Sequence, residues 1–250
     1  MNTLYTLLPC YNESENIGAL IEEWLSQTEN FKNFDFQLTV VCIDDKSTDN
    51  TAAVIQAYSN RYSNVLLLKH SVNQNLGGAL KTGFQYFLKH GKSGDLCVVM
   101  DGDNTHNPKF ACSMFEKINK EADCVIASRY CGQSAVVGVP GFRKFLSDGA
   151  KCYYQLVLNV KNVRDYTCGY RMYTYDILAK ADQVYGDKFI ERKTFSCMME
   201  VLYKLAGTGC RFAEVPFVLR YDKKEGASKM RILKTVYDSV ITALKLKFKL

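Results

Sequence analysis

The feature that most limits the fold of this chain is the alternation of short apolar segments with helical patterns in its N-terminal half. The apolar segments are strand-sized and cover residues 3–9, 37–44, 64–69, 95–100 and 123–128. Helical patterns fill the intervals at residues 14–28, 50–62, 76–90 and 107–120. Strands that are apolar on both faces and separated by helices form mostly parallel sheets with helices on both sides. The predicted fold class is therefore α/β, with a Rossmann-like sheet.

The second half of the chain has a less regular pattern. A glycine-containing loop at 132–141 precedes expected helices at 142–158 and 194–206, an expected strand at 211–221, and a basic stretch at 223–229. We expect one domain over residues 1–230 and a C-terminal helix over residues 231–250. In the first half, Asn12 or Ser14 is the expected N-cap of the first helix, and Asn107-Pro108 supplies a cap and a first-turn proline for the fourth.

Polar segments follow three of the expected strands. Residues 10–13 come after the first strand, residues 44–49 after the second, and residues 101–103 after the fourth. In an open parallel sheet, ligands bind in the crevice at the carboxyl ends of the strands. The sequence therefore predicts a binding site where these three segments meet.

Four carboxylates belong to these segments, and they are Asp44, Asp45, Asp101 and Asp103. Like charges in one crevice repel unless a cation or hydrogen-bond donors compensate them. Mg²⁺ or Mn²⁺ prefers oxygen ligands and can hold a substrate diphosphate at the same time. The alternative is that both segments are solvated turns and helix caps, because Asp-Gly is a common turn dipeptide. Their occurrence together at one edge of the sheet favours the cation.

Basic residues in the second half provide a possible counterpart to the carboxylates. Guanidinium groups suit phosphate oxygens because the planar fork binds them in pairs. The formal net charge of +6 also suits an anionic partner. Any one of these residues taken alone is better explained as an ordinary surface charge, and only the cluster in its context favours a phosphate site. The candidates for a basic wall are Arg129, Arg143, Arg171, Arg220, Lys224 and Lys229.

The last segment has an apolar stripe at helical spacing together with an excess of lysine and arginine. The stripe comprises Ile232, Leu233, Val236, Tyr237, Val240, Ile241 and Leu244. Such a helix either lies on an anionic membrane surface or docks on its own domain with a solvated basic face. The pattern is typical of both.

Several other classes of protein do not fit the sequence. No apolar stretch approaches the roughly 18–20 residues that span a bilayer, and no signal peptide precedes the first strand, so we expect a cytoplasmic or membrane-peripheral protein. Ten cysteines occur without a CxxC pair, which favours reduced, structural thiols. No GxGxxG or P-loop motif is present. We expect Gly77, Gly78 and Gly83 to shape a loop and helix start beside the site.

Seven motifs in order give the chain a resemblance to a known family. They are LPCYNESENI (8–17), VVCIDDKSTDNT (40–51), NQNLGGALKTGF (73–84), VVMDGDNTHNP (98–108), VIASRY (125–130), RDYTCGYRMY (164–173) and EVPFVLRYDKKEGASKM (214–230). The set closely resembles the family 2 glycosyltransferases of the GT-A fold, in particular the dolichol- or polyprenol-phosphate mannosyltransferase and glucosyltransferase branch. The resemblance extends from residue 4 to about residue 230.

The resemblance implies a role for individual residues. Asp101 and Asp103 match the metal-binding DxD pair, with Gly102 between them, and Asp165 with Gly169-Tyr170-Arg171 matches an element on the acceptor side. Asp103, Asp165 and Arg129 are the expected catalytic residues. The residues expected to bind the nucleotide sugar are Pro9, Tyr11, Glu13, Ile43, Asp45, Asp101, Gly102, Arg220 and Lys229.

The resemblance also implies an activity. This is inverting, Mg²⁺- or Mn²⁺-dependent transfer of one hexose from a GDP- or UDP-linked sugar to a polyprenyl or dolichyl phosphate. The enzyme is expected at the cytosolic face of an anionic membrane, without a nucleic-acid partner. One alternative is transfer to a sugar hydroxyl of a glycolipid or polysaccharide, for which Asp165 or another carboxylate must act as base. A second alternative is a nucleotide-sugar-binding protein without turnover.

The sequence departs from the family pattern at a few positions. Thr105 replaces a glutamine that often follows the DxD pair, and Asn107 replaces the first proline of an HPP run. One extra residue lies between Pro216 and Lys229, so the family's arginine role falls on Arg220, Lys223 or Lys224. The QxxRW motif of processive polysaccharide synthases is absent, since the only tryptophan is Trp24.

Overall fold

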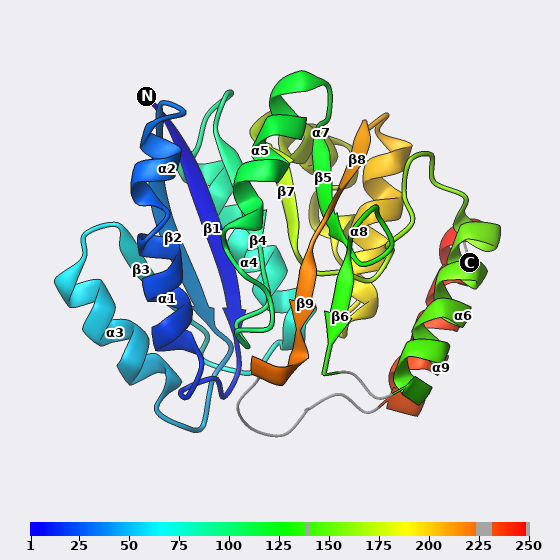
Figure 1. Cartoon of the computed structure of the whole chain (residues 1–250), viewed down its shortest axis with the longest axis horizontal. Coiled ribbons are helices and arrows are strands. Elements are labelled where there is room, and N and C mark those ends of the chain that lie inside the picture. The colour runs from blue at the N-terminus through cyan, green and yellow to red at the C-terminus, as the bar shows by residue number, and fades with distance from the viewer. Residues whose placement is uncertain (139–140, 224–231, 249–250) are drawn as a thin grey trace.

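A seven-stranded sheet forms the centre of the computed structural model, which describes residues 1–138, 141–223 and 232–248 (Figure 1). Its strand order is β3-β2-β1-β4-β7-β5-β8, and every pairing except those of β7 is parallel. The predicted mostly parallel α/β sheet is therefore confirmed. The strands are β1 (Asn2–Cys10), β2 (Phe36–Asp44), β3 (Val65–Lys69), β4 (Leu96–Val99), β5 (Cys124–Ser128), β7 (Arg171–Thr174) and β8 (Phe212–Pro216).

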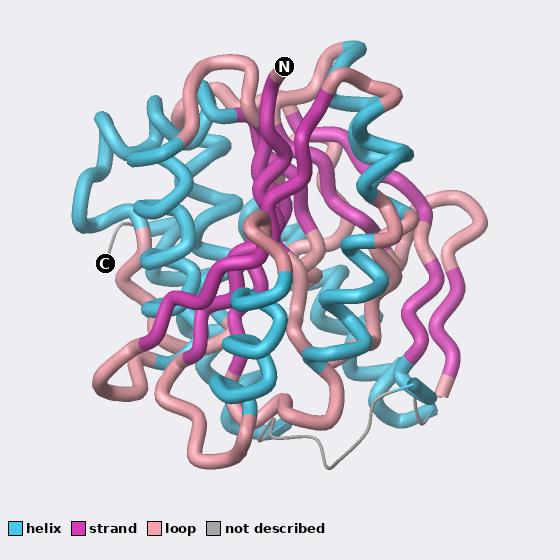
Figure 2. Tube along the Cα trace, turned by 90° about the vertical axis from the view of Figure 1, so that its left-hand side faces the viewer, coloured by secondary structure: helices cyan, strands magenta, loops and turns pink. Residues whose placement is uncertain are grey.

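Helices cover both faces of this sheet (Figure 2). One face carries α1 (Ile17–Leu25), α2 (Thr28–Lys32), α3 (Thr51–Arg61) and α5 (Phe110–Lys120). The other carries α4 (Asn75–His90), α7 (Tyr175–Tyr185) and α8 (Ser196–Gly207). Outside α8, the long helices α6 (Gly141–Leu158) and α9 (Ile232–Phe248) pack against each other and form a further layer (Figure 1). Short 3-10 turns occur at η1 (Gly186–Phe189) and η2 (Tyr221–Lys223).

Strand β7 is the main element that the sequence pattern did not predict. It runs antiparallel between β4 and β5, so Met172 lies opposite both Val98 and Val125. The strand is four residues long and begins with an arginine, which hides it from a search for apolar runs. Its insertion brings the segment that precedes Arg171 to the carboxyl edge of the sheet, the edge where the parallel strands end.

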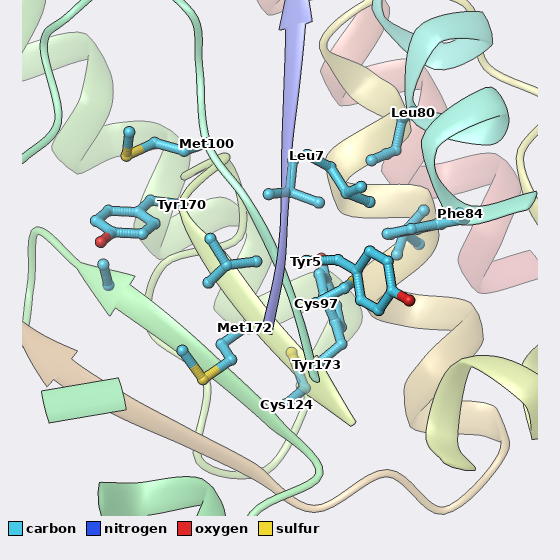
Figure 3. Packing of buried hydrophobic residues seen from close by; sticks show 14 of the residues in the cluster. Tyr5, Leu7, Leu80, Phe84, Cys97, Met100, Cys124, Tyr170, Met172 and Tyr173 are labelled. Carbon is cyan, nitrogen blue, oxygen red and sulfur yellow. The ribbon is translucent and has the colours of Figure 1, made fainter. Parts of the chain in front are cut away.

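Helix α4 approaches the sheet closely because it carries Gly83. A Cβ atom at this glycine would lie 3.2 Å from Cδ1 of Leu7 and 3.4 Å from Cδ1 of Ile43. Phe84 then packs edge-on against Tyr173 of β7, with 5.4 Å between ring centroids, and Figure 3 shows both rings in the core beside Leu7. Gly83 lies in the middle of α4, so the predicted role in shaping a loop and helix start was wrong for this glycine.

Both predicted helix caps were wrong. Helix α1 begins after Asn16 and α5 after Lys109, and neither residue makes a side-chain capping hydrogen bond. Asn12 has a left-handed backbone (φ 55) and instead accepts a hydrogen bond from the Thr48 backbone N–H at 2.8 Å. Asn107 accepts from the Lys109 N–H at 3.0 Å in a turn before the helix. These asparagines therefore shape loops at the carboxyl edge.

The strand predicted over residues 211–221 is two strands in two sheets. After β8 ends at Pro216, β9 (Val218–Arg220) pairs in parallel with β6 (Ala135–Val137). Proline has no backbone N–H to continue a ladder, which gives a local reason for the break. The two-stranded sheet lies beside the central one at its carboxyl edge (Figure 1).

Helix α9 docks on the domain along one face. Ser239, Thr242 and Ala243 are buried, and the Tyr153 hydroxyl of α6 donates to the Val240 carbonyl at 3.0 Å. The division into residues 1–230 and 231–250 stays a prediction. Among the described residues, no helix is long and apolar enough to cross a membrane. All ten cysteines are free thiols, as predicted.

Candidate active site at the carboxyl edge of the sheet

Three loops meet at the carboxyl edge because β1 lies between β2 and β4. Side-chain oxygens join the loops after β1 and β2. The Asn12 backbone N–H donates to the Ser47 hydroxyl at 2.9 Å, and the Glu13 N–H donates to the Thr51 hydroxyl at 2.8 Å. The predicted convergence of these polar segments on one edge is thus a property of the strand order.

The residues predicted to hold the nucleotide lie in these loops or under them. Tyr11 is exposed, whereas Glu13 is buried and accepts a hydrogen bond from the Asn16 amide at 2.9 Å. Pro9 lies opposite Ile43 in the parallel β1–β2 pairing. The Ile43 side chain is fully buried against α4, so it supports this region from the core.

Asp45 has hydrogen-bond donors of its own. Its Oδ1 lies 2.7 Å from Nδ1 of His70 and 2.7 Å from the Gln74 backbone nitrogen. The carboxylate is almost completely buried. Of the two means of compensation considered for the four carboxylates, a cation or hydrogen-bond donors, the structure shows donors at Asp45.

The Asp101-Gly102-Asp103 turn is tightly enclosed. A Cβ at Gly102 would lie 3.0 Å from the Pro9 carbonyl oxygen, and a Cβ at Gly169 would lie 2.8 Å from Oδ1 of Asp101. Oδ1 of Asp103 accepts the Thr105 hydroxyl at 2.7 Å. Thr105, in place of the family's glutamine, therefore positions Asp103 from a buried location.

The loop after β4 and the neighbouring end of β2 have buried polar atoms that fit a bound cation and diphosphate. Oδ2 of Asp44, Oδ1 of Asn104 and Nδ1 of His106 are buried without a hydrogen-bond partner, and the His106 nitrogen lies 4.0 Å from Oδ2 of Asp101. Within the described residues, no group of three or more His, Cys, Asp or Glu side chains could hold a metal ion alone. Mg²⁺ is commonly held by one or two carboxylates plus substrate phosphates, and Asp101 with Asp103 fits that ligand set.

Arg129 and Asp165 form a buried ion pair next to this turn. Nη2 of Arg129 lies 2.6 Å from Oδ1 of Asp165, and Nε donates to Oδ2 at 2.8 Å. The backbone N–H groups of Arg129 and Cys168 donate to the same carboxylate, at 3.0 Å each. Burial alone would raise the pKa of Asp165, but the charge and hydrogen bonds of Arg129 with these backbone groups hold it below its ordinary value.

This arrangement limits what the pair can do chemically. Asp165 has no exposed surface and a lowered pKa, so it is poorly placed to take a proton from an acceptor. Arg129 also donates to the Thr167 hydroxyl at 2.6 Å, and its side chain is 19% exposed. Nε and Nη2 of Arg129 make these hydrogen bonds, whereas Nη1 makes none to a residue that the structure describes. The pair therefore positions the loop that contains Asp165.

Of the six residues predicted to form a basic wall, the structure describes the side chains of Arg129, Arg171 and Arg220. Arg171 is fully buried and donates to the Met198 and Tyr166 carbonyls at 2.6 and 2.8 Å, so its assignment to the wall was wrong. Arg220 is half exposed and makes a two-pronged contact with Asp222, at 2.7 Å for the shorter pair of atoms. Lys224, Lys229 and the side chains of Arg143 and Lys223 lie outside the described residues.

Two residues with clear contacts were missed in the sequence. Glu214 accepts the backbone N–H groups of Arg164 and Asp165 at 2.7 and 2.8 Å, and burial raises its pKa. Its role depends on β8 lying beside β5, which no local pattern indicates. His70 was detectable, because it directly follows β3 and so lies at the carboxyl edge.

Comparison with known proteins places the chain in a family. Residues 6–181 match the family described as Glycosyl transferase family 2. The chain is 29% identical to the undecaprenyl-phosphate mannosyltransferase of Micrococcus luteus, over 90% of this chain and 86% of that protein. It is 27% identical to the polyprenol monophosphomannose synthase of Mycolicibacterium smegmatis, over 90% of this chain and 79% of that protein. The chain is 30% identical to the dolichol-phosphate mannosyltransferase of Pyrococcus furiosus. That match covers 93% of this chain and 60% of that protein.

A solved structure supports the fold. Glucosyl-3-phosphoglycerate synthase from Mycobacterium tuberculosis, crystallised with Mn²⁺, uridine diphosphate and phosphoglyceric acid, superposes with a TM-score of 0.68. The superposition covers 98% of this chain and 78% of that one, at 16% sequence identity. The predicted GT-A fold is confirmed. The chain belongs to glycosyl transferase family 2, and it is a glycosyltransferase.

Proposed function

We propose that the enzyme transfers one hexose, with inversion, from a GDP- or UDP-linked donor to a polyprenyl or dolichyl phosphate, with Mg²⁺ or Mn²⁺ as cofactor. The three relatives named above support the acceptor class, because each is named for a lipid-phosphate mannose transfer or synthesis. The Mn²⁺ and uridine diphosphate in the structural neighbour support a divalent cation with a nucleotide donor.

The observation that carries the proposal is the burial of Asp165 against Arg129. A sugar hydroxyl acceptor must lose its proton as it attacks, so transfer to it requires a general base within reach. A lipid monophosphate has a second pKa of about 6 and is already an anionic nucleophile at neutral pH. A site whose candidate base is buried in an ion pair suits the phosphate acceptor.

In this proposal each loop has a separate task. The nucleoside is assigned to Pro9, Tyr11, Glu13 and Asp45, with Ile43 supporting them from the core. Asp101 and Asp103 would hold the cation, which also takes substrate phosphates as ligands. The cation supplies a Lewis acid that neutralises the leaving diphosphate. Nη1 of Arg129, with Arg220 and Lys229, is assigned to phosphate oxygens. Inversion requires the acceptor oxygen to approach opposite the leaving group, so these cations hold two anions in line.

A lipid acceptor implies that the enzyme works at a membrane surface, and we propose the cytosolic face of an anionic membrane. The α6 and α9 layer has exposed apolar side chains, with Leu156 84%, Tyr237 67% and Phe248 63% exposed. Lys245 and Lys247 are exposed on the same layer. Apolar side chains with nearby lysines are the combination by which helices bind anionic lipid surfaces.

The proposal is tested by incubating the full chain with UDP- and GDP-hexoses and a short polyprenyl phosphate, with and without Mn²⁺. We expect a glycosylated lipid phosphate that forms only with the metal and that Asp103→Asn abolishes. Asp187→Asn serves as the matched control, because Asp187 is exposed and, within the described part of the chain, its ion pair is with Lys81. Transfer that is unaffected by Asp103→Asn would contradict the metal assignment. Binding of the donor without transfer to any acceptor would return the chain to the class of non-catalytic binders.

A further inference from the structure

Behind Asp45 lies a buried histidine that connects β2 to helix α4. His70 follows the last residue of β3 and is 7% exposed. Its Nδ1 lies 2.7 Å from Oδ1 of Asp45, and its Nε2 lies 2.9 Å from the Thr82 hydroxyl of α4. The neighbouring Gly83 lets α4 approach close enough for this second contact.

The contacts of Asp45 use only one of its two oxygens. A carboxylate is an acceptor, so the imidazole Nδ1–H must be the donor to it, and the Gln74 N–H donates to the same Oδ1 at 2.7 Å. Each carboxylate oxygen has about two lone pairs, so these two donors fill Oδ1. No donor among the described residues is hydrogen-bonded to Oδ2. Asp45 therefore has one acceptor oxygen left for a ligand.

We propose that His70 is a specificity-determining residue that holds Asp45 in this one-oxygen arrangement and so selects uracil over guanine in the donor. The inference rests on the proposed function, which places the nucleoside beside Asp45. Uracil has a single N–H between two carbonyls, and one acceptor oxygen satisfies it. Guanine has two adjacent donors, N1–H and N2–H, which pair best with both oxygens of a carboxylate, as an arginine fork does. Here Oδ1 is already occupied.

The test compares two substitutions that retain different halves of the histidine. In His70→Asn the amide nitrogen lies near the position of Nδ1 and keeps the bond to Asp45. In His70→Gln the amide nitrogen lies near the position of Nε2 and keeps the contact with Thr82. Oδ1 of Asp45 then has one hydrogen-bond donor fewer. Thr82→Val removes the α4 contact and retains the imidazole. Calorimetry measures the affinity of each full-length variant for UDP and for GDP in the presence of Mn²⁺, without an acceptor.

We expect the wild-type chain and His70→Asn to bind UDP at least about tenfold more tightly than GDP, and His70→Gln to lose most of that ratio. Tenfold is the scale of one hydrogen bond. The ratio of the UDP affinity to the GDP affinity tests the inference, because partial unfolding of a variant lowers both affinities together. GDP binding as tight as UDP binding in the wild type, or an equal ratio in the Asn and Gln variants, would overturn the inference alone. Binding of neither diphosphate would contradict the proposed function and the inference with it.

Discussion

At the residue scale, the site depends on how charges are compensated after burial. Asp165 and Arg129 form a pair in which Asp165 has no contact with solvent. Breaking a buried pair costs more than the pair contributes, because the remaining charge has lost both water and partner. The cationic partner, Arg129, is itself placed by β5, which ends at Ser128.

Asp165→Asn should therefore destabilise the fold, by about 3–5 kcal/mol, the range for a buried pair that loses one partner. Urea denaturation of the variant and the wild type measures the difference. Asp187→Asn removes an exposed partner of Lys81 and should change the midpoint little. Equal midpoints for Asp165→Asn and the wild type would show that the pair is not a structural element of the site.

Glu214 should give stability the opposite pH dependence from Asp165. Burial raises its folded pKa, so its stabilising contribution is complete below the unfolded value of about 4.3 and is lost as pH rises through the folded pKa. Asp165, with a lowered pKa, contributes above the unfolded value of about 3.9 and loses that contribution in acid.

Glu214→Gln keeps an oxygen for the N–H groups of Arg164 and Asp165 and removes the charge. We expect this variant to be as stable as the wild type at pH 4 and more stable at pH 7, in thermal melts at both values. Greater loss of stability at pH 7 than at pH 4 would contradict this assignment.

At the element scale, the fold brings distant loops into contact through small residues. A Cβ at Gly77, near the start of α4, would lie 1.9 Å from the Arg192 carbonyl oxygen, and the Gly77 N–H donates to the Lys193 carbonyl at 2.9 Å. The loop before α8 therefore packs directly on the start of α4. The Arg192 carbonyl oxygen is a backbone atom, so it cannot move away from an added Cβ by side-chain rotation.

Gly77→Ala should consequently separate the two elements and cost about 1–3 kcal/mol, as overpacking does elsewhere. Gly149→Ala is the matched control, because this glycine lies within α6 with nothing within 4 Å of the added methyl group. The control should gain about 0.5–1 kcal/mol from helix propensity. Chemical denaturation of both variants gives the comparison, and equal stabilities would contradict the packing argument.

Elements with strong apolar periodicity could be predicted from the sequence, and elements defined by tertiary pairing could not. Strands β1 and β2 are buried along most of their length, and their predicted bounds differ from the observed ones by about one residue. Strand β7 was missed because it gains its stability by filling the space between β4 and β5. Likewise, the DxD turn was detectable as a pattern, whereas the pairing of Asp165 with Arg129 requires chain segments 36 residues apart to meet.

At the scale of the whole molecule, the carboxyl edge holds the site, and α6 and α9 form a separate layer outside α8 (Figure 1). Leu156 and Tyr237 are exposed apolar side chains of this layer. Substituting Leu156→Glu with Tyr237→Glu adds charge to exposed positions while the buried face of α9 is retained. We expect the double variant to float less with anionic liposomes than the wild type does, because charges are costly at the lipid boundary. Unchanged flotation would remove this layer from membrane contact.

The proposed acceptor class is tested most directly by offering the enzyme two acceptors that differ only in the phosphate. A polyprenyl phosphate and the matching polyprenol alcohol are each incubated with Mn²⁺ and a labelled nucleotide hexose, and the label in the lipid is measured. Because Asp165 is buried in its pair with Arg129, we expect label in the phosphate and none in the alcohol. Label in the alcohol, or in neither lipid, would contradict transfer to an already ionised acceptor.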